Sequence, residues 1–216
     1  MGEDMPTKTK IDIGMPKEYT GTSIWNDDQY IVFLTVQHDD LLPNPCEEQD
    51  GMGTMHSFNS HHINFIDPNS HKGEALLKKP DVVPLSYYEH GLCQWDTAGA
   101  GPQCQWDSVS FAGVWEPDQT LIDLANQRGL KGQERQKQMV QWAQECCKDY
   151  THFCNGSIYE YVIQAFKLRK EGNNIFNKKN DYRFDEPIYE DSQGSFYGLE
   201  SVEEAVEEAV QEIDLS

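Results

Sequence analysis

His90, Cys104, Asp107 and Ser108 are the residues whose types and spacing best suit nucleophilic chemistry. A histidine beside a thiol or hydroxyl, oriented by a carboxylate, is the arrangement that activates a nucleophile. If the strands expected in this segment pair, His90 lies near Cys104 or Ser108. In this interpretation the four are catalytic residues of a small metal- or thiol-dependent hydrolase.

The alternative for the same segment is a hairpin rich in turns. Asp107 and Ser108 then bond to backbone N–H groups, and Cys104 is a small core residue. We favour the hairpin, because a sequence does not show mutual geometry. We therefore favour a protein that is not an enzyme.

Metal ligands are a second chemical possibility. His90, Cys93 and Cys104 offer nitrogen and sulfur ligands for zinc, but no Cys-x-x-Cys pair completes the set. Carboxylates and imidazoles that suit Mg²⁺ or Mn²⁺ are more numerous. These are Asp39, Asp40, Asp50, Asp67, Asp107, His61 and His62. Their spacing matches no established pattern, so we predict no metal site and no cofactor.

One tetrapeptide occurs twice, as Cys93–Asp96 and again as Cys104–Asp107. The small, glycine-rich stretch between the copies predicts a hairpin tip. Trp95 and Trp106 then either stack across the hairpin or form an exposed pair that anchors a partner protein. Both interpretations remain open from the sequence.

The charge of the chain limits its partners. The 216 residues include 37 acidic and 17 basic side chains, for a net charge of −20. This charge argues against direct binding to nucleic acid or to an anionic membrane, since both would repel the chain. It is compatible with a basic partner protein, with divalent cations, or with imitation of nucleic acid.

More than half of the excess lies near the C-terminus, where residues 181–216 hold 12 acidic side chains and one basic side chain. Residues 201–213 predict an amphipathic helix with an apolar stripe and a glutamate face. The stripe comprises Val202, Ala205, Val206, Ala209, Val210 and Ile213, and the face comprises Glu203, Glu204, Glu207, Glu208 and Glu212. Such a face suits a basic groove, as DNA mimics do, although it is also what a simply solvated helix shows. A basic loop at 167–179 would partly neutralise it.

The remaining periodicity predicts an α+β fold with an antiparallel sheet and two middle helices. The expected strands cover 30–36, 54–58, 82–88, 111–115 and 158–168, and the helices begin at Pro117 and before Met139. We expect a flexible arm at 1–22, one core domain at 23–198 and the acidic helix at 199–216, packed on the core.

Location and redox state follow from two expectations. No apolar run reaches the roughly 20 residues that span a bilayer, and residues 1–10 are too polar for a secretion signal. We therefore expect a cytoplasmic protein whose six cysteines are free thiols.

Four segments together resemble a family of uncharacterised proteins from phages, plasmids and integrative elements. They are Asn44–Met55, Tyr88–Gly91, Cys104–Ser108 and Asp191–Gly198. The corresponding family motifs end in Gly-Thr-Met, or read Tyr-Asp-His-Ser-Gly, Cys-x-Trp-Asp-Ser-Gly and Asp-Ser-Cys-Trp-Gly-Phe-Tyr-Gly. This sequence lacks the serine after His90 and has Val109 in place of a glycine. The resemblance implies a mobile-element origin and implies no activity.

These observations predict an acidic phage or mobile-element accessory protein that acts by binding another protein. Its partner would be the basic surface of a host nucleic-acid-handling protein, such as a restriction or CRISPR-type enzyme, in the host cytoplasm. The binding residues would be the five glutamates of the C-terminal helix together with Trp95 and Trp106. The hydrolase remains the alternative, a virion or assembly component is a third reading, and the oligomeric state stays open.

Overall fold

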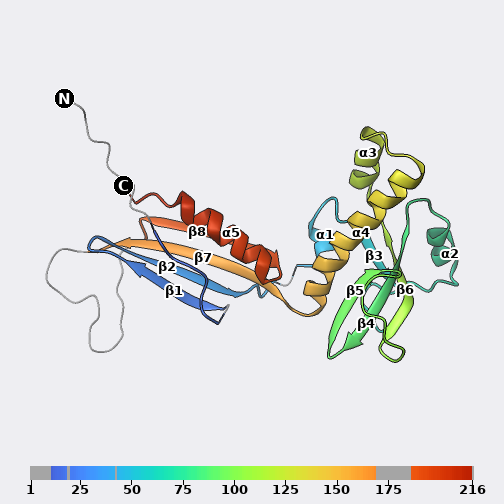
Figure 1. The fold of residues 1–216 in the computed structure, drawn as a ribbon, viewed down its shortest axis with the longest axis horizontal. Helices are drawn as coiled ribbons and strands as arrows, with labels where there is room; N and C mark the ends of the chain where they lie inside the picture. The colour runs from blue at the N-terminus through green and yellow to red at the C-terminus, as the bar shows by residue number, and fades with distance from the viewer. Residues whose placement is uncertain (1–10, 19, 42, 169–185, 216) are drawn as a thin grey trace. The chain divides into compact units, whose positions relative to one another are not determined.

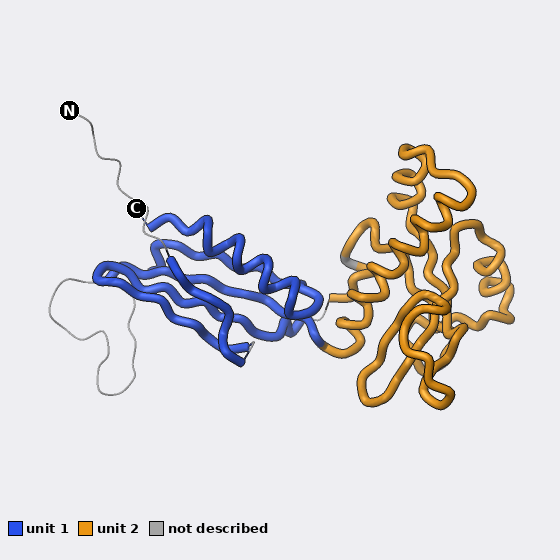
Figure 2. The backbone as a smooth tube through the Cα atoms, in the orientation of Figure 1, with its two compact units in different colours: residues 1–41, 157–216 blue, residues 42–156 orange. Residues whose placement is uncertain are grey.

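A computed structural model describes residues 11–18, 20–41, 43–168 and 186–215. The chain forms two compact units, one made of residues 1–41 and 157–216 and the other of residues 42–156 (Figure 2). The second unit is thus an insertion within the first. A single inserted segment explains why no domain-sized linker divides the sequence into two halves.

The first unit is an antiparallel sheet with one helix against it (Figure 1). Its strand order is β1-β2-β7-β8, with β1 at Gly21–Asn26, β2 at Tyr30–His38, β7 at Ile158–Lys167 and β8 at Tyr189–Tyr197. The helix α5, Leu199–Glu212, packs against β7 and β8. Val32, Leu34 and Val36 alternate along β2 and are fully buried, as the period of a strand requires.

The insertion begins and ends at neighbouring positions of this sheet. Strand β2 pairs with β7 from Tyr30 opposite Lys167 to His38 opposite Tyr159. Beyond the last pair, the Asp39 N–H donates to the Ile158 carbonyl at 3.0 Å. Asp39 is 3% exposed, and its carboxylate accepts from the N–H groups of Leu41 and Ser195, each at 2.9 Å. Asp39 therefore links the end of β2 to Ile158 of β7 and Ser195 of β8.

The second unit has its own antiparallel sheet, in the order β3-β6-β4-β5. The strands are β3 at Thr54–Ser57, β4 at Val83–His90, β5 at Leu92–Thr97 and β6 at Ser108–Glu116. The helices are α1 at Pro45–Glu48, α2 at His71–Leu77, α3 at Gln119–Gln127 and α4 at Gly132–Cys154. The core between α4 and the sheet includes Leu85, Trp115, Met139 and Ala143.

Helix α4 also covers the outer edge of β5. Thr151 Oγ1 accepts from the Trp95 N–H at 3.0 Å. One turn later, the Asn155 side chain accepts from the Cys93 N–H at 3.0 Å and donates to the Cys93 carbonyl at 2.9 Å. An edge strand normally exposes such groups to another strand. Here two side chains of the helix satisfy them and fix α4 against β5.

The Gly-Thr-Met segment of the suspected family motif has a structural role. Gly53 has a φ of +71°, and a Cβ atom there would lie 2.6 Å from both the Glu116 carbonyl oxygen and Trp115 Nε1. Trp115 Nε1 donates to the Met52 carbonyl at 2.8 Å. The Asp118 carboxylate accepts from the Gly53 N–H at 3.2 Å and caps α3 through the Leu121 N–H at 2.9 Å. The motif therefore packs a loop over a buried tryptophan.

The predicted α+β class and antiparallel pairing are confirmed, and α3, α4 and α5 cover the expected helices. The strands form two sheets, however, where one was expected. The predicted hairpin between the two tetrapeptide copies is wrong, because β5 and β6 each pair with β4. The tight turn lies at Gly91, where φ is +85°.

The N-terminal segment differs from the predicted flexible arm. Ile11 lies within the predicted flexible arm, yet it is 8% exposed and belongs to the core of the first unit with Ile13 and Met15 packed nearby. Residues 1–10 and most of the predicted basic loop, 169–179, lie outside the described residues.

Candidate functional site

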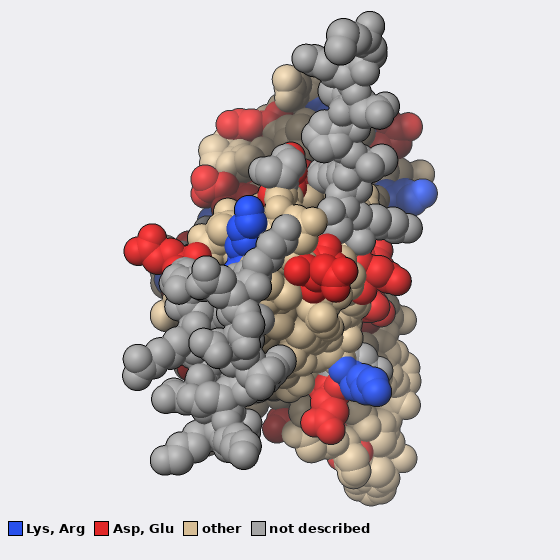
Figure 3. All heavy atoms as spheres, turned by 90° about the vertical axis from the view of Figure 1, so that its left-hand side faces the viewer, with Lys and Arg blue, Asp and Glu red and all other residues tan. Residues whose placement is uncertain are grey.

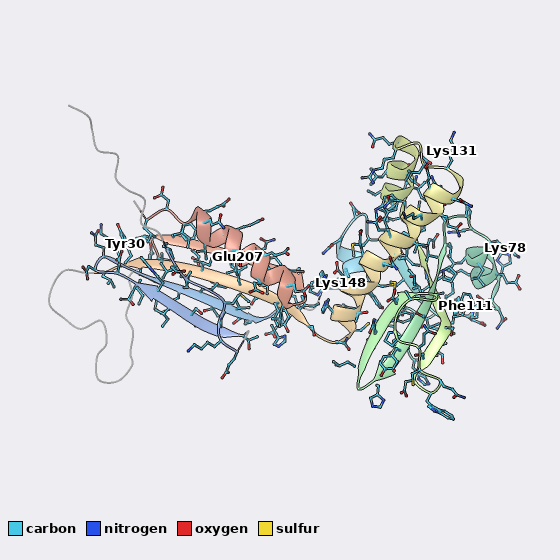
Figure 4. The ribbon with its side chains drawn as sticks, viewed as in Figure 1. Tyr30, Lys78, Phe111, Lys131, Lys148 and Glu207 are labelled. Carbon is cyan, nitrogen blue, oxygen red and sulfur yellow. The ribbon has the colours of Figure 1, made fainter. Side chains whose placement is uncertain are left out.

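The glutamate face of α5, defined as Glu203, Glu204, Glu207, Glu208 and Glu212, lies where the sequence predicts it. All five side chains are exposed, and Figure 4 marks Glu207 on the helix. On the opposite side of α5, Val202, Val206 and Ile213 are at most 2% exposed. Burial of this stripe against β7 and β8 fixes the helix so that the glutamates point outward.

The charge on this face is dense. Residues 203–212 rise by about 14 Å along an α-helix, so the five carboxylates give roughly one charge per 3 Å. One strand of DNA carries about one charge per 3.4 Å of helix axis. Among the described residues, none of the five glutamates has an ion pair or hydrogen bond. The face is therefore similar to a nucleic-acid strand in linear charge density.

The same glutamates oppose the stability of α5. Three pairs of like charges lie four residues apart on this face, Glu203 with Glu207, Glu204 with Glu208, and Glu208 with Glu212. Each such pair costs about 0.2–0.5 kcal/mol. Glu212 stands in the last turn, where the helix dipole favours basic side chains, and that turn holds none. Gly198 at the N-cap provides no side-chain hydrogen bond. The glutamate pattern is thus not explained by the stability of the helix.

Burial and acidic groups near α5 together raise the pKa of a tyrosine in the sheet beneath the helix. Burial raises the pKa of Tyr189, and the nearby charges of Asp191 and Glu212 raise it further. On the face drawn in Figure 3, acidic side chains form several clusters with a few lysine and arginine side chains among them.

The structure brings three of the four predicted catalytic residues together. Asp107 Oδ2 lies 3.4 Å from His90 Nδ1 and 3.4 Å from Cys104 Sγ. The backbone aligns them, because the Glu89 N–H donates to the Asp107 carbonyl at 3.1 Å. Both groups therefore face the carboxylate, and the histidine side chain is 75% exposed. A thiol nucleophile needs the imidazole itself as its base, so this order of contacts does not favour the hydrolase.

Ser108 follows the turn interpretation. Its hydroxyl donates to the Pro102 carbonyl at 2.9 Å and accepts from the Cys104 N–H at 2.9 Å. Both bonds are made to backbone groups, so the Ser108 hydroxyl stabilises the turn, as the hairpin interpretation expects.

The two tryptophans have different environments. Trp95 is 3% exposed in the core of the second unit, whereas Trp106 is 86% exposed in the turn before β6. They neither stack across a hairpin nor form an exposed pair, so the prediction of Trp95 as an exposed anchor for a partner protein is wrong. The cause is the position of the turn, which places Trp95 on β5 facing α4. Trp106 alone remains available to a partner.

The predicted loop carboxylates and imidazoles do not gather into one centre. No group of three or more histidine, cysteine, aspartate or glutamate residues suited to a metal ion occurs within the described ranges. Asp67 accepts from the Asn69 N–H at 2.9 Å, and His62 Nδ1 lies 2.8 Å from Ser57 Oγ. These side chains serve loop structure.

A pocket of about 450 Å³ in the second unit was not predicted. Aromatic rings from β4, β5 and α4 line it, together with one imidazole and one carboxylate. These residues are Tyr87, Trp95, Tyr150, Phe153, His62 and Glu89. Because Tyr87 and Glu89 alternate along β4, and Cys93 and Trp95 along β5, a correctly placed turn at Gly91 would have put all four on one face.

Contacts between the rings make the pocket wall continuous. The Tyr87 and Trp95 ring centroids are 4.8 Å apart, and the His62 ring lies 5.0 Å from Tyr87 and 5.6 Å from Trp95. The Tyr87 hydroxyl donates to Glu89 at 2.9 Å, and burial together with this bond raises the tyrosine pKa. Burial lowers the pKa of His62, so its ring is neutral at pH 7.

Two thiol pairs lie in the second unit, and all six cysteines are free thiols. Cys93 and Cys154 line the pocket, and the interaction between the two thiols lowers the pKa of Cys93 and raises that of Cys154. Cys46 Sγ lies 3.6 Å from the buried Cys146 Sγ, and their contact lowers the pKa of Cys46 and raises that of Cys146.

No protein-family model matches the chain, and no curated protein or solved structure matches it. The resemblance to mobile-element proteins therefore stays a prediction. Among the described residues, no helix is both long enough and apolar enough to cross a membrane.

Replacing Glu207 and Glu208 by glutamine should raise the stability of the chain at low salt. The double variant removes like-charge pairs on α5, so we expect about 0.5–1.5 kcal/mol more free energy of unfolding in urea. Added salt should shrink the gain by screening. Glu145→Gln, an exposed change on α4, is the control. A gain that is equal at 20 mM and 500 mM NaCl would contradict the electrostatic account.

Cys93 should react with iodoacetamide faster than Cys154 near pH 7.5, although Cys154 is the more exposed thiol. The thiolate is the nucleophile, and the pair concentrates thiolate character on Cys93. Initial alkylation rates at each cysteine, read by mass spectrometry of peptides, check this order. Faster alkylation of Cys154 would show that exposure decides the order.

Proposed function

We propose that this protein acts by binding a basic surface of another protein through the glutamate face of α5. The observation that carries the proposal is a row of five exposed carboxylates without partners in the described structure, on a helix whose opposite side is buried. An anchored helix presents its charges with little further loss of conformational freedom on binding. The like-charge repulsion along α5 is relieved when a basic partner covers the face.

The partner class that fits this charge pattern is a protein that normally holds nucleic acid. Such proteins carry lysine and arginine along a groove that follows a phosphate backbone, and the spacing of charge on α5 is similar to that of one strand. Complementary charge would steer the encounter and make the association rate fall with salt.

The narrower form of the proposal is an inhibitor of a host restriction or CRISPR-type enzyme, acting in the host cytoplasm. Its support is the resemblance to mobile-element proteins, combined with the acidic helix. By this mechanism the protein occupies the DNA-binding groove and touches neither nucleic acid nor membrane itself.

A nuclease panel with two charge-matched variants tests the proposal. The first variant replaces the five glutamates of the face by glutamine. The second neutralises five exposed acidic residues of the inserted unit, Glu47, Asp50, Asp123, Glu134 and Glu145. Both variants lose five negative charges, and the charge is lost from α5 in the first and from the inserted unit in the second.

We expect the unmodified chain to inhibit DNA cleavage by at least one restriction or RNA-guided nuclease, with inhibition that weakens as salt rises. The α5 variant should need more than about tenfold more protein for the same inhibition, since several close ion pairs are lost. The second variant should stay near the unmodified chain. Equal loss in both variants, or no inhibition of any nuclease at low salt, would overturn the proposal.

A further inference from the structure

The pocket of the second unit has features that the binding role of α5 does not use. Its volume of about 450 Å³ lies within the range of roughly 300–1,000 Å³ that is typical of small-molecule sites. Four aromatic side chains line it, Tyr87, Trp95, Tyr150 and Phe153. We propose that this pocket binds a small organic cation with an ammonium head group.

The charges that line the pocket favour a cation. Among the described residues that line it, Glu89 is the one carboxylate and none is a lysine or an arginine. His62 adds no positive charge at pH 7, since burial keeps its ring neutral. An anion would therefore meet a carboxylate without a compensating base, whereas a cation gains an opposite charge at the wall.

The aromatic rings favour the same ligand. The negative face of an aromatic ring attracts ammonium groups within about 6 Å, by roughly 0.5–1 kcal/mol at exposed sites and about 2 kcal/mol when water is excluded. Tyr87, Trp95 and His62 have ring centroids within 5.6 Å of one another, and Phe153 contacts Tyr150 at 5.5 Å. These rings pack on one another at the wall of the pocket, where Trp95 and Tyr150 are almost fully buried and Tyr87 and Phe153 are partly buried. Aromatic rings are the groups that hold quaternary ammonium ligands.

An unsatisfied acceptor lies at the same wall. Asn64 lines the pocket, and its Oδ1 is the buried side-chain oxygen without a hydrogen bond in the described structure. Its Nδ2 donates to the Met55 carbonyl at 3.0 Å, so exchanging the amide atoms would place two oxygens together. A buried acceptor without a partner costs about 1–3 kcal/mol. A small rotation of Asn64 would let a ligand hydroxyl or N–H group donate to Oδ1.

Choline and its neutral isostere 3,3-dimethylbutanol are the matched probes. They share shape and hydroxyl group and differ in the charge of one atom. Titration of the whole chain, followed by amide NMR shifts, should show choline binding at Cys93–Trp95 and His152–Asn155. We expect the isostere to bind at least about threefold more weakly, from the lost charge and ring contacts, and acetate not to bind.

Three variants locate the interaction. Glu89→Gln should weaken choline binding by about two- to fivefold, as for an exposed ion pair, and leave the isostere unchanged. Phe153→Leu keeps an apolar side chain but removes a ring, so it should weaken choline by about two- to fivefold more than the isostere. Glu145→Gln, which removes a charge elsewhere on the same unit, should change neither.

The pattern of results decides the proposal. No shift with 20 mM choline, equal binding of the isostere, or equal effects of Glu89→Gln and Glu145→Gln would each overturn it. The amide spectrum of each variant without ligand shows whether it is folded. The α5 face plays no part in these titrations, so the pocket and the proposed protein binding stand or fall separately.

Discussion

Burial of the apolar stripe of α5 against β7 and β8 is the interaction on which the acidic surface depends. Val202, Val206 and Ile213 have at most 2% of their surface exposed, and each fully buried aliphatic side chain contributes about 1.5–3 kcal/mol. That contribution offsets the repulsion between glutamates on the other side of the same helix. The acidic face therefore persists because the core supports it, and not because the glutamates support the helix.

In the inserted unit, the main constraint is that polar side chains at the end of α4 satisfy the backbone groups of an edge strand. Thr151 of α4 and Asn155, the residue that caps its C-terminus, satisfy the outer edge of β5. This contact brings the last turn of α4 beside the aromatic face of the β4–β5 hairpin. The pocket lies along this junction. Its aromatic wall and its carboxylate thus follow from how one helix covers one strand edge.

Much of the secondary structure could be predicted from the sequence, because its signals are local. The buried run of β2, the Pro117–Asp118 start of α3 and the two-sided pattern of α5 each depend on near neighbours. The sheet order was not predictable in this way. Strands β2 and β7 pair although the whole inserted unit separates them in the sequence. No local pattern marks an insertion between two strands.

The candidate sites differ in the same way, since one depends on local sequence and the other on strand pairing. The glutamate face needed only helical periodicity, whereas the pocket required the correct partner for each strand. The repeated tetrapeptide predicted a hairpin between its two copies. Because β5 pairs with β4 instead, Tyr87 and Trp95 lie opposite each other on one face, which that hairpin does not predict. The sequence predicted that His90, Cys104 and Asp107 would lie close together. Only the structure shows that both His90 and Cys104 contact the Asp107 carboxylate.

Site-specific photo-crosslinking tests the central claim most directly. A photoreactive side chain at position 207 lies on the glutamate face, and one at position 145 lies on an exposed part of α4. The account predicts that position 207 crosslinks to the lysine- and arginine-rich groove of a nucleic-acid-binding protein, and that competing DNA or 500 mM salt abolishes the crosslink. Crosslinks at position 145 but not 207, or a crosslink at 207 that neither DNA nor salt reduces, would contradict it.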